Sequence, residues 1–107
     1  MELIQYHIVL VNLDPIIGSE IRKTRPCVII SPNEMNKYLK TIVVAPMTTT
    51  SRKYPTRIEV KHDGKLGWIV IDQILTIDKL RIVSTLGRLS NPEVKEVKSV
   101  MKETFID

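Results

Sequence analysis

The 107-residue sequence has a single cysteine, Cys27, and only two histidines, His7 and His62. One cysteine cannot form an intrachain disulfide, and no CxxC, HExxH or spaced His/Cys group offers a zinc site. No segment matches the GxxxxGK[ST] or GxGxxG loops that bind nucleotide phosphates. We therefore expect no metal ion and no cofactor.

Long apolar runs are absent as well. No run approaches the roughly 18 residues that a membrane-spanning helix needs, and residues 1–5 lack the basic segment and cleavage site of a signal peptide. The lone cysteine also fits a reducing compartment. These features predict a cytoplasmic protein with a single domain over residues 1–107.

Acidic residues are scarce in residues 22–57, which contain eight lysines and arginines but only one acid, Glu34. This segment has a net charge of +7. The rest of the chain, with eight basic and eleven acidic residues, has −3, which accounts for the total of +4. A basic segment on an otherwise acidic body favours a polyanion-binding face. Charge alone would equally allow a solvated surface with scattered lysines.

Short apolar runs between turn residues dominate the chain as far as residue 89. Residues 26–31 are almost continuously apolar, which predicts a strand buried on both faces. The pattern predicts strands at 8–13, 26–31, 41–45, 57–61 and 67–71, a shorter strand near 84–89, a hairpin turn at 62–65, and helical turns at 34–38 and 78–80.

The C-terminal segment has a different pattern. Ser90, Pro92 and Glu93 combine a capping residue, a proline in the first turn and an acid, which is typical of a helix start. Apolar residues then recur at helical spacing, at Val94, Val97, Met101 and Phe105. We expect a mainly β fold, a small and strongly bent antiparallel barrel, with one C-terminal amphipathic helix packed against it.

Two polar loops carry most of the groups suited to catalysis. In residues 18–26, Pro26 favours an extended backbone at Arg25, which should lie at the mouth of the buried strand. In residues 46–55, four consecutive hydroxyl residues, 48–51, precede two cations and an aromatic ring. Such groups donate to phosphates, neutralise charge and stack on bases. An ordinary polar turn uses the same residue types.

Three blocks of sequence resemble the MazF/PemK/Kid toxins of type II toxin–antitoxin systems. The first consists of Leu13-Asp14-Pro15, Gly18-Ser19-Glu20 and Thr24-Arg25-Pro26, followed by Val28-Ile29-Ile30-Ser31-Pro32. The second is Val43-Val44-Ala45-Pro46-Met47-Thr48 with Tyr54-Pro55, and the third is Asp72-Gln73-Ile74 with Thr76-Ile77-Asp78. The blocks occur in the family's order, and the resemblance covers essentially the whole chain.

This resemblance implies an SH3-like barrel of the CcdB/MazF toxin type that forms a homodimer. It further implies an mRNA interferase, a sequence-specific endoribonuclease toxin that cuts single-stranded RNA without a metal ion. In this reaction the RNA 2′-hydroxyl attacks the adjacent phosphate and leaves a 2′,3′-cyclic phosphate and a 5′-hydroxyl. The toxin would inhibit growth of the cell until a cognate antitoxin with an acidic tail neutralises it.

The resemblance assigns catalytic roles to Arg25, Thr48 and Glu20. Kid-like members have a histidine at the position of Ser19 and an arginine at that of Val70, so the MazF-style pair of Arg25 and Thr48 is the one carried over. Gln73 matches a position that reads a base in some relatives. The expected substrate contacts are Ser19, Thr49, Ser51, Lys53, Tyr54, Asp72 and Gln73.

The chemistry is consistent with these assignments. The guanidinium of Arg25 can clamp two non-bridging phosphate oxygens, and the hydroxyl of Thr48 can donate a further hydrogen bond. Arginine stays protonated in proteins, so we expect Arg25 to act as an electrostatic clamp and as proton donor to the leaving 5′-oxygen. The base stays open between Glu20, Asp72 and solvent. Glu20 could instead orient Arg25, and Asp72 could satisfy a turn as a buried carboxylate.

Two other hypotheses about the function of the chain remain at this point. The first is a non-enzymatic CcdB-like toxin that binds a protein target such as gyrase, because fold does not fix function. The second is an RNA-binding homologue without activity. Of the residues outside the loops, we expect Trp68 in the core or at a dimer interface, and Cys27 as a small buried hydrophobic residue.

Overall fold

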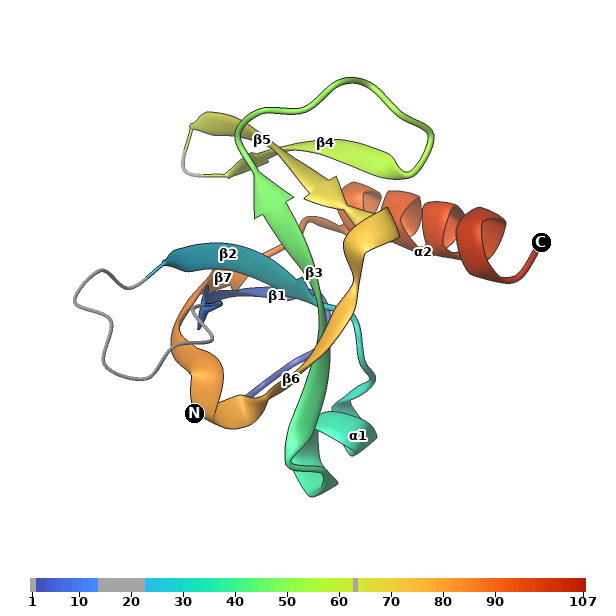
Figure 1. The fold of residues 1–107 in the computed structure, drawn as a ribbon. Helices are drawn as coiled ribbons and strands as arrows, with labels where there is room; N and C mark the ends of the chain where they lie inside the picture. Colours follow the sequence, from blue (N-terminus) through green and yellow to red (C-terminus); the bar gives the residue numbers. More distant parts are fainter. Residues whose placement is uncertain (1, 14–22, 63) are drawn as a thin grey trace.

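The structure is a computed structural model, and it describes residues 2–13, 23–62 and 64–107 (Figure 1). Within these described residues, two helices, two short 3-10 turns and seven strands follow one another. In order they are β1 His7–Asn12, β2 Thr24–Ile29, α1 Asn33–Tyr38, β3 Thr41–Thr48, β4 Arg57–His62, β5 Lys65–Val70, η1 Ile71–Gln73, β6 Leu75–Asp78, η2 Lys79–Arg81, β7 Ile82–Arg88 and α2 Asn91–Phe105.

The seven strands form one bent antiparallel sheet, in the order β4-β5-β3-β2-β1-β7, with β6 also paired to β3. β3 holds the sheet together because it changes partner along its length. Its first residues pair with β6, its middle pairs with β2 through Val44↔Ile29, and its last two residues pair with β5 through Thr48↔Trp68. The β4–β5 hairpin therefore lies over one end of the barrel, and α1 lies at the other end (Figure 1).

The second half of β2 is buried on both faces, as the apolar run at residues 26–31 predicted, and most of β1 and β3 is buried as well. Alternate side chains point to opposite sides of a strand, so Cys27 and Ile29 enter the barrel interior while Val28 enters a second core. The barrel interior also contains Val9 and Val44. All five of these side chains are fully buried.

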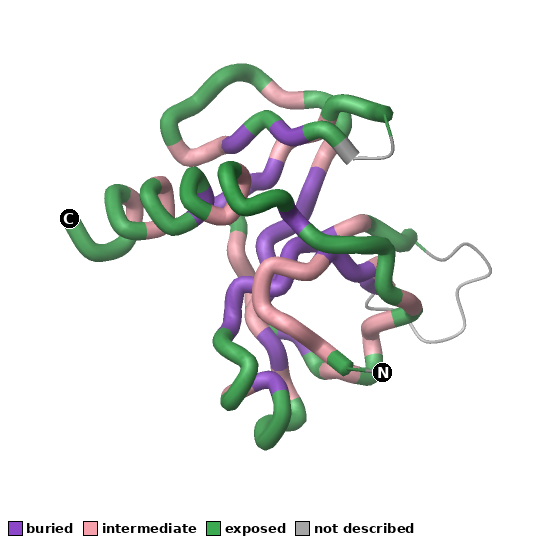
Figure 2. Tube along the Cα trace, turned by 180° about the vertical axis from the view of Figure 1, so that it is seen from behind, coloured by how far each residue is buried: buried purple, intermediate pink, exposed green. Residues whose placement is uncertain are grey.

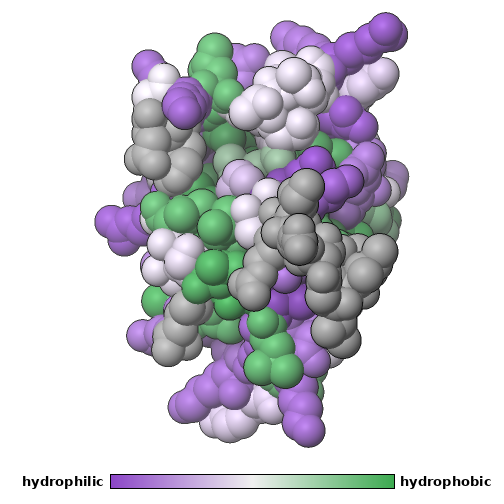
Figure 3. All heavy atoms as spheres, turned by 60° about the vertical axis from the view of Figure 1, so that its left-hand side comes forward, coloured by the Kyte–Doolittle hydropathy of each residue, from purple (hydrophilic) through white to green (hydrophobic). Residues whose placement is uncertain are grey.

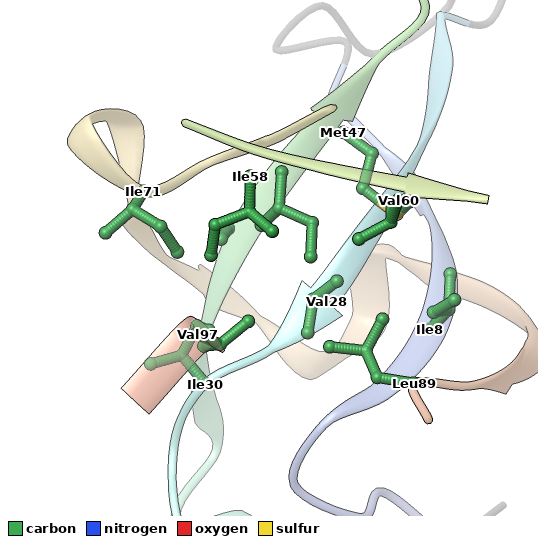
Figure 4. Close-up of a cluster of buried hydrophobic side chains, with 11 residues drawn as sticks. Ile8, Val28, Ile30, Met47, Ile58, Val60, Ile71, Leu89 and Val97 are labelled. Atoms are coloured by element: carbon green, nitrogen blue, oxygen red, sulfur yellow. The ribbon is translucent and has the colours of Figure 1, made fainter. Parts of the chain in front are cut away.

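The second core lies between the sheet, the β4–β5 hairpin and α2 (Figure 4). Val28 of β2 points toward Ile58 and Val60 of β4, and Val97 of α2 closes the cluster. Burying apolar area in this way contributes roughly 25 cal/mol per Å². This core fixes the hairpin against the barrel, and the hairpin supplies one wall of the candidate site described below.

Helix α2 begins as the sequence predicted. The Ser90 hydroxyl accepts a hydrogen bond from the Glu93 amide at 3.3 Å, and the Glu93 carboxylate accepts one from the Ser90 amide at 2.8 Å. This reciprocal pair satisfies two N–H groups that have no partner within the helix. Val97 is fully buried, but Phe105 is 49% exposed, so the apolar stripe continues past the core. Figure 2 shows the exposed outer side of this helix.

The predicted turn between β4 and β5 also has the expected backbone. Gly64 has φ of +75°, a conformation that favours glycine, and His62 pairs with Lys65 across the turn. Asp63 lies outside the described residues. Among the described residues, no helix is long and apolar enough to cross a membrane.

Several elements differ from the sequence-based expectations, and the strand predicted at 26–31 runs instead from Thr24 to Ile29. Strand β6 was not predicted, because its four residues are too short to show a periodic pattern and its pairing with β3 defines it. The expected strand at 67–71 ends at Val70, and Ile71 begins the turn η1 instead. The predicted strand near 84–89 is longer and starts at Ile82, whereas the helical turns expected at 34–38 and 78–80 occur within about one residue of their predicted bounds.

Candidate active site

A cavity of about 360 Å³ opens where β2, β3 and β5 separate. Its walls are residues 24–26 of β2, residues 47–49 at the end of β3, and residues 65–67 at the start of β5. Figure 3 turns this side of the molecule toward the viewer and shows apolar surface framed by hydrophilic side chains. The lining of the cavity therefore combines the apolar side chains of Pro26, Met47 and Leu66 with hydroxyl groups and two cations.

The pairing of β3 explains why the cavity lies here. The β2–β3 ladder ends at Cys27↔Pro46, and Met47 then pairs with Ile69 of β5. Pro26 and Pro46 both lie where this ladder stops, and proline has no N–H to extend a ladder. The first residues of β2 are thus released from β3, and the space between them and β5 forms the cavity.

Arg25 and Thr48 lie on the rim of the same cavity. Extending the β2–β3 register by two residues places Arg25 opposite Thr48 across the opening. Arg25 is exposed and lies in strand β2, in the extended backbone that Pro26 predicted. It makes no ion pair with any residue that the structure describes. Within the described part of the chain, its guanidinium is therefore not held by a carboxylate.

The Thr48 hydroxyl is held by the loop that follows β3. It donates to the carbonyl oxygen of Thr50 at 3.1 Å and accepts from the Thr50 amide at 3.3 Å. A hydroxyl has one hydrogen to donate. Thr48 can therefore donate to a ligand only when this hydrogen turns away from the Thr50 carbonyl, while the bond from the Thr50 amide can persist and hold the oxygen in place.

A second group of polar side chains is organised around Arg57, the first residue of β4. Its Nε and Nη2 atoms donate to the two carboxylate oxygens of Asp72, at 3.3 and 3.5 Å. Its Nη1 atom donates to Ser51 Oγ at 2.9 Å, and its guanidinium lies 4.9 Å from the centre of the Tyr54 ring. Thr56 Oγ1 donates to the same carboxylate at 2.9 Å. Arg57 thus joins the loop after β3 to the turn η1.

These contacts change the acidity of Asp72. Partial burial of the carboxylate opposes ionisation, but hydrogen bonds from Arg57 and Thr56 and the charge of Arg57 outweigh it and hold the pKa of Asp72 below its usual value. A carboxylate with a lowered pKa that is already bonded on both oxygens is a weak proton acceptor. Asp72 satisfies a turn through Thr56, as one expectation had it, but its side chain is 34% exposed and is not buried.

The structure brings most of the predicted site residues into these two groups. Arg25, Thr48 and Thr49 line the cavity, whereas Ser51, Tyr54 and Asp72 contact Arg57. Ser51 is more constrained than expected, because its hydroxyl hydrogen is donated to the Arg52 carbonyl at 2.8 Å. Lys53 and Gln73 are exposed, and Ser19 and Glu20 lie outside the described residues.

Several residues of the site were not singled out from the sequence, among them Thr56, which donates to Asp72. Lys65 and Leu66 begin β5 and line the cavity beside Arg25, with Leu66 62% exposed. Arg57 was counted only as part of the basic segment. Its position directly after the Tyr54–Pro55 turn is the one feature of the sequence that could have indicated a link to that loop.

Two side chains outside the site, Trp68 and Cys27, differ in how well their positions match the predictions. Trp68 is half-buried and belongs to neither core cluster, so the expected core position is not met, and a place at a dimer interface stays a prediction. Cys27 is fully buried, as predicted, and burial raises the pKa of its thiol to about 12 despite the opposing charge of Arg25. A thiol with this pKa is not a nucleophile at neutral pH.

Within residues 2–13, 23–62 and 64–107, no group of three His, Cys, Asp or Glu residues is arranged to hold a metal ion.

Comparisons with known proteins identify the family. The family described as PemK-like, MazF-like toxin of type II toxin-antitoxin system matches residues 4–105. The protein named Endoribonuclease MazF of Staphylococcus saprophyticus is 37% identical over 98 residues, which cover 86% of this chain and 82% of that protein.

Solved structures show the same fold at lower identity. MazF from Deinococcus radiodurans has a TM-score of 0.79 at 22% identity and covers 96% of both chains. Toxin MazF-mt6 of Mycobacterium tuberculosis has a TM-score of 0.78 at 22% identity, covering 92% of this chain and 95% of that one. The mainly β barrel with a C-terminal helix is thus the MazF fold, as predicted. The chain belongs to the PemK-like, MazF-like toxins of type II toxin–antitoxin systems.

Proposed function

We propose that this chain is a sequence-specific endoribonuclease toxin that cuts single-stranded RNA without a metal ion. The observation that carries the proposal is the shared cavity of Arg25 and Thr48, in which a guanidinium and a hydroxyl come from facing strands and a further cation, Lys65, lines the same opening. The relative from S. saprophyticus, named an endoribonuclease, supports the same activity.

In the proposed reaction the 2′-hydroxyl oxygen attacks the neighbouring phosphorus. A new 2′-O–P bond forms, the bond from phosphorus to the 5′-oxygen breaks, and the products are a 2′,3′-cyclic phosphate and a 5′-hydroxyl. Negative charge builds up on the non-bridging oxygens as the bond forms. Arg25 neutralises this charge with two parallel N–H donors, and Thr48 adds a hydroxyl donor.

The balance of the reaction needs two proton transfers. One proton leaves the attacking 2′-hydroxyl and one arrives at the 5′-oxygen. Arg25 is the proposed donor to the 5′-oxygen. Glu20 or solvent is the proposed acceptor, because the paired carboxylate of Asp72 is a weak base. In the alternative role, Glu20 orients Arg25.

The remaining predicted residues are assigned to binding the nucleotides on either side of the cleaved bond. The exposed ring of Tyr54 offers a stacking surface, and Lys53 offers a charge for a phosphate. Gln73 and Asp72 offer hydrogen bonds to base edges from the turn η1. Thr49, Ser51 and Ser19 complete the proposed set of contacts.

The proposed partners are an antitoxin and a second copy of the chain. Solved complexes of MazE with MazF from D. radiodurans, one at a TM-score of 0.81 and 23% identity, support an antitoxin bound to this fold. An acidic antitoxin tail would complement the net charge of +7 in residues 22–57. The family resemblance supports a homodimer, with half-buried Trp68 as the proposed interface residue. Because its substrate is cellular RNA, we place the activity in the cytoplasm.

The test is cleavage of a long single-stranded RNA by the purified protein in EDTA, beside the variant Arg25→Ala. We expect the wild type to cut at a few sites and leave cyclic phosphate and 5′-hydroxyl ends, and the variant to bind RNA without cutting it. Equal cutting by both proteins would overturn the catalytic assignment. Failure of the wild type to cut varied RNAs, with growth arrest retained in cells, would instead favour a toxin that binds a protein target.

A further inference from the structure

Arg57 uses three sides of its guanidinium at once. The edge formed by Nε and Nη2 binds the Asp72 carboxylate, Nη1 binds Ser51 Oγ, and the central carbon Cζ lies over the Tyr54 ring, 4.9 Å from its centre. The planar, five-donor fork of arginine allows such simultaneous contacts, which a lysine ammonium cannot reproduce. Its side chain is only 20% exposed, so it is turned toward these partners and not toward solvent.

The three partners of Arg57 are all proposed substrate contacts, and they come from two separate segments. Ser51 and Tyr54 belong to the loop between β3 and β4, which has no regular secondary structure, whereas Asp72 belongs to η1, 15 residues beyond Arg57. Arg57 itself starts β4, whose pairing with β5 begins at Arg57↔Val70. A residue on a paired strand thus holds a loop against a rigid turn.

We propose that Arg57 is a positioning residue that fixes the spacing of Tyr54, Ser51 and Asp72, and thereby determines which nucleotides are accepted beside the cleaved bond. This inference rests on the proposed endoribonuclease function. It assigns to Arg57 an effect on substrate recognition and not on the chemical step, because the residue is bonded to binding groups while Arg25 and Thr48 line the cavity.

Loss of Arg57 has two physical consequences for RNA binding. The loop between β3 and β4 loses its link to η1, so RNA must order Tyr54 and Ser51 on binding at a cost in conformational entropy. Asp72 loses its positive partner and presents an unpaired negative charge to a polyanion. Both effects weaken binding, and both leave Arg25 and Thr48 in place.

The experiment compares wild type, Arg57→Gln and Arg57→Lys with the matched control Arg88→Gln. Arg88 is an exposed arginine at the end of β7, and β7 lies at the opposite edge of the sheet from β4. Steady-state kinetics on a short RNA with the preferred site give KM and kcat. Sequencing of the ends from a long RNA gives the set of cut sites, and thermal unfolding gives the stability of each variant.

We expect Arg57→Gln to raise KM about tenfold, the scale of losing a hydrogen bond to a charged group. We expect kcat to stay within about threefold of wild type, since the interaction lost is one of binding. The cut sites should become more varied, because the groups that contact the flanking bases are no longer held at fixed spacing. Arg57→Lys should recover the KM only in part, and Arg88→Gln should match wild type.

Several results would overturn the inference. Unchanged KM and unchanged cut sites in Arg57→Gln, with only a lower melting temperature, would assign Arg57 a purely structural role. Full recovery by Arg57→Lys would mean that charge alone matters. If Arg57→Gln does not fold, Asp72→Asn tests the same contact, and wild-type cut sites in that variant would refute the inference. No cutting by wild type would overturn the proposed function together with this inference, whereas unchanged Arg57 variants of an active enzyme would overturn this inference alone.

Discussion

The Thr48 hydroxyl is bonded twice to Thr50, as donor to its carbonyl oxygen at 3.1 Å and as acceptor from its amide at 3.3 Å. Thr48 lines the same cavity as Arg25. This local turn holds the hydroxyl oxygen at a defined point before any ligand arrives. Such preorganisation is what makes a single donor valuable in a charged transition state.

The first prediction concerns this hydroxyl. Thr48→Val keeps the shape of the side chain but removes its donor, and we expect the cleavage rate to fall by about 10²–10³-fold. Thr48→Ser keeps the hydroxyl and should retain most of the rate. Single-turnover cleavage at saturating enzyme measures the effect without a contribution from binding. Equal rates for Thr48→Val and wild type would remove Thr48 from the catalytic set.

The second prediction concerns the effect of pH on stability. The folded protein lowers the pKa of Asp72, so below about pH 4, the usual aspartate value, the unfolded chain takes up a proton before the folded chain does. The contribution of Asp72 to the free energy of unfolding is therefore present at neutral pH and is lost as pH falls through the folded-state pKa. Denaturant unfolding of wild type and Asp72→Asn should show a difference in stability at pH 7 that shrinks toward pH 3.

The matched control for this pH effect is Asp107→Asn. Asp107 pairs with Lys102 at 3.6 Å, but both side chains are more than half exposed, and exposed pairs contribute little. We expect this variant to follow the wild-type pH dependence. A difference between wild type and Asp72→Asn that stays constant from pH 7 to pH 3 would show that the Arg57 contact does not stabilise the ionised carboxylate.

Much of the fold was predictable because its signals are local. The apolar run at residues 26–31 and the Ser90–Glu93 helix start both depend on neighbouring residues. The strand forms two residues earlier than predicted, and the helix start occurs as predicted. Strand β6 depends instead on its pairing with β3, through contacts such as Ile42↔Ile77, and no window of sequence contains that pairing. Local sequence patterns therefore predict the longer helices and strands, whereas the short strand β6 forms only through its tertiary pairing with β3.

The candidate site divides in the same way. The resemblance to MazF toxins named Arg25 and Thr48, and the cavity between β2 and β3 brings them together. Lys65 reaches that cavity only because β3 changes partner from β2 to β5, and Arg57 meets Asp72 only because β4 runs beside η1. Sequence reasoning found the groups that act through their own chemistry, whereas it missed those whose role depends on a distant partner.

The third prediction concerns the start of α2. Ser90→Ala removes the side-chain acceptor for the Glu93 amide and should destabilise the protein by about 1 kcal/mol. Ser90→Gly should cost only a few tenths of a kcal/mol, because glycine is tolerated at this position. Urea unfolding of the three proteins measures the difference. RNA cleavage per folded molecule should not change, since Ser90 lies outside the cavity.

The fourth prediction tests whether Lys65 binds phosphate. Lys65 is exposed and lines the cavity beside Arg25, so Lys65→Ala should weaken binding of all RNA sequences to a similar extent. A lysine that neutralises one phosphate releases counterions on binding, and its loss should reduce the slope of log affinity against log salt by about 1. Lys65→Ala is made in a protein that already carries Arg25→Ala. This protein should bind RNA without cutting it, so its affinity can be measured by titration.

The control for Lys65 is Lys95→Ala, an exposed lysine on α2 that does not line the cavity. Long-range charge effects alone would weaken RNA binding in both variants and change both salt slopes alike. A direct phosphate contact changes the slope only for Lys65→Ala, because counterion release requires that the cation lie at the RNA backbone. Equal slopes for the two variants would place the phosphate of the bound RNA away from Lys65 and leave Arg25 as the cation of the cavity that contacts it.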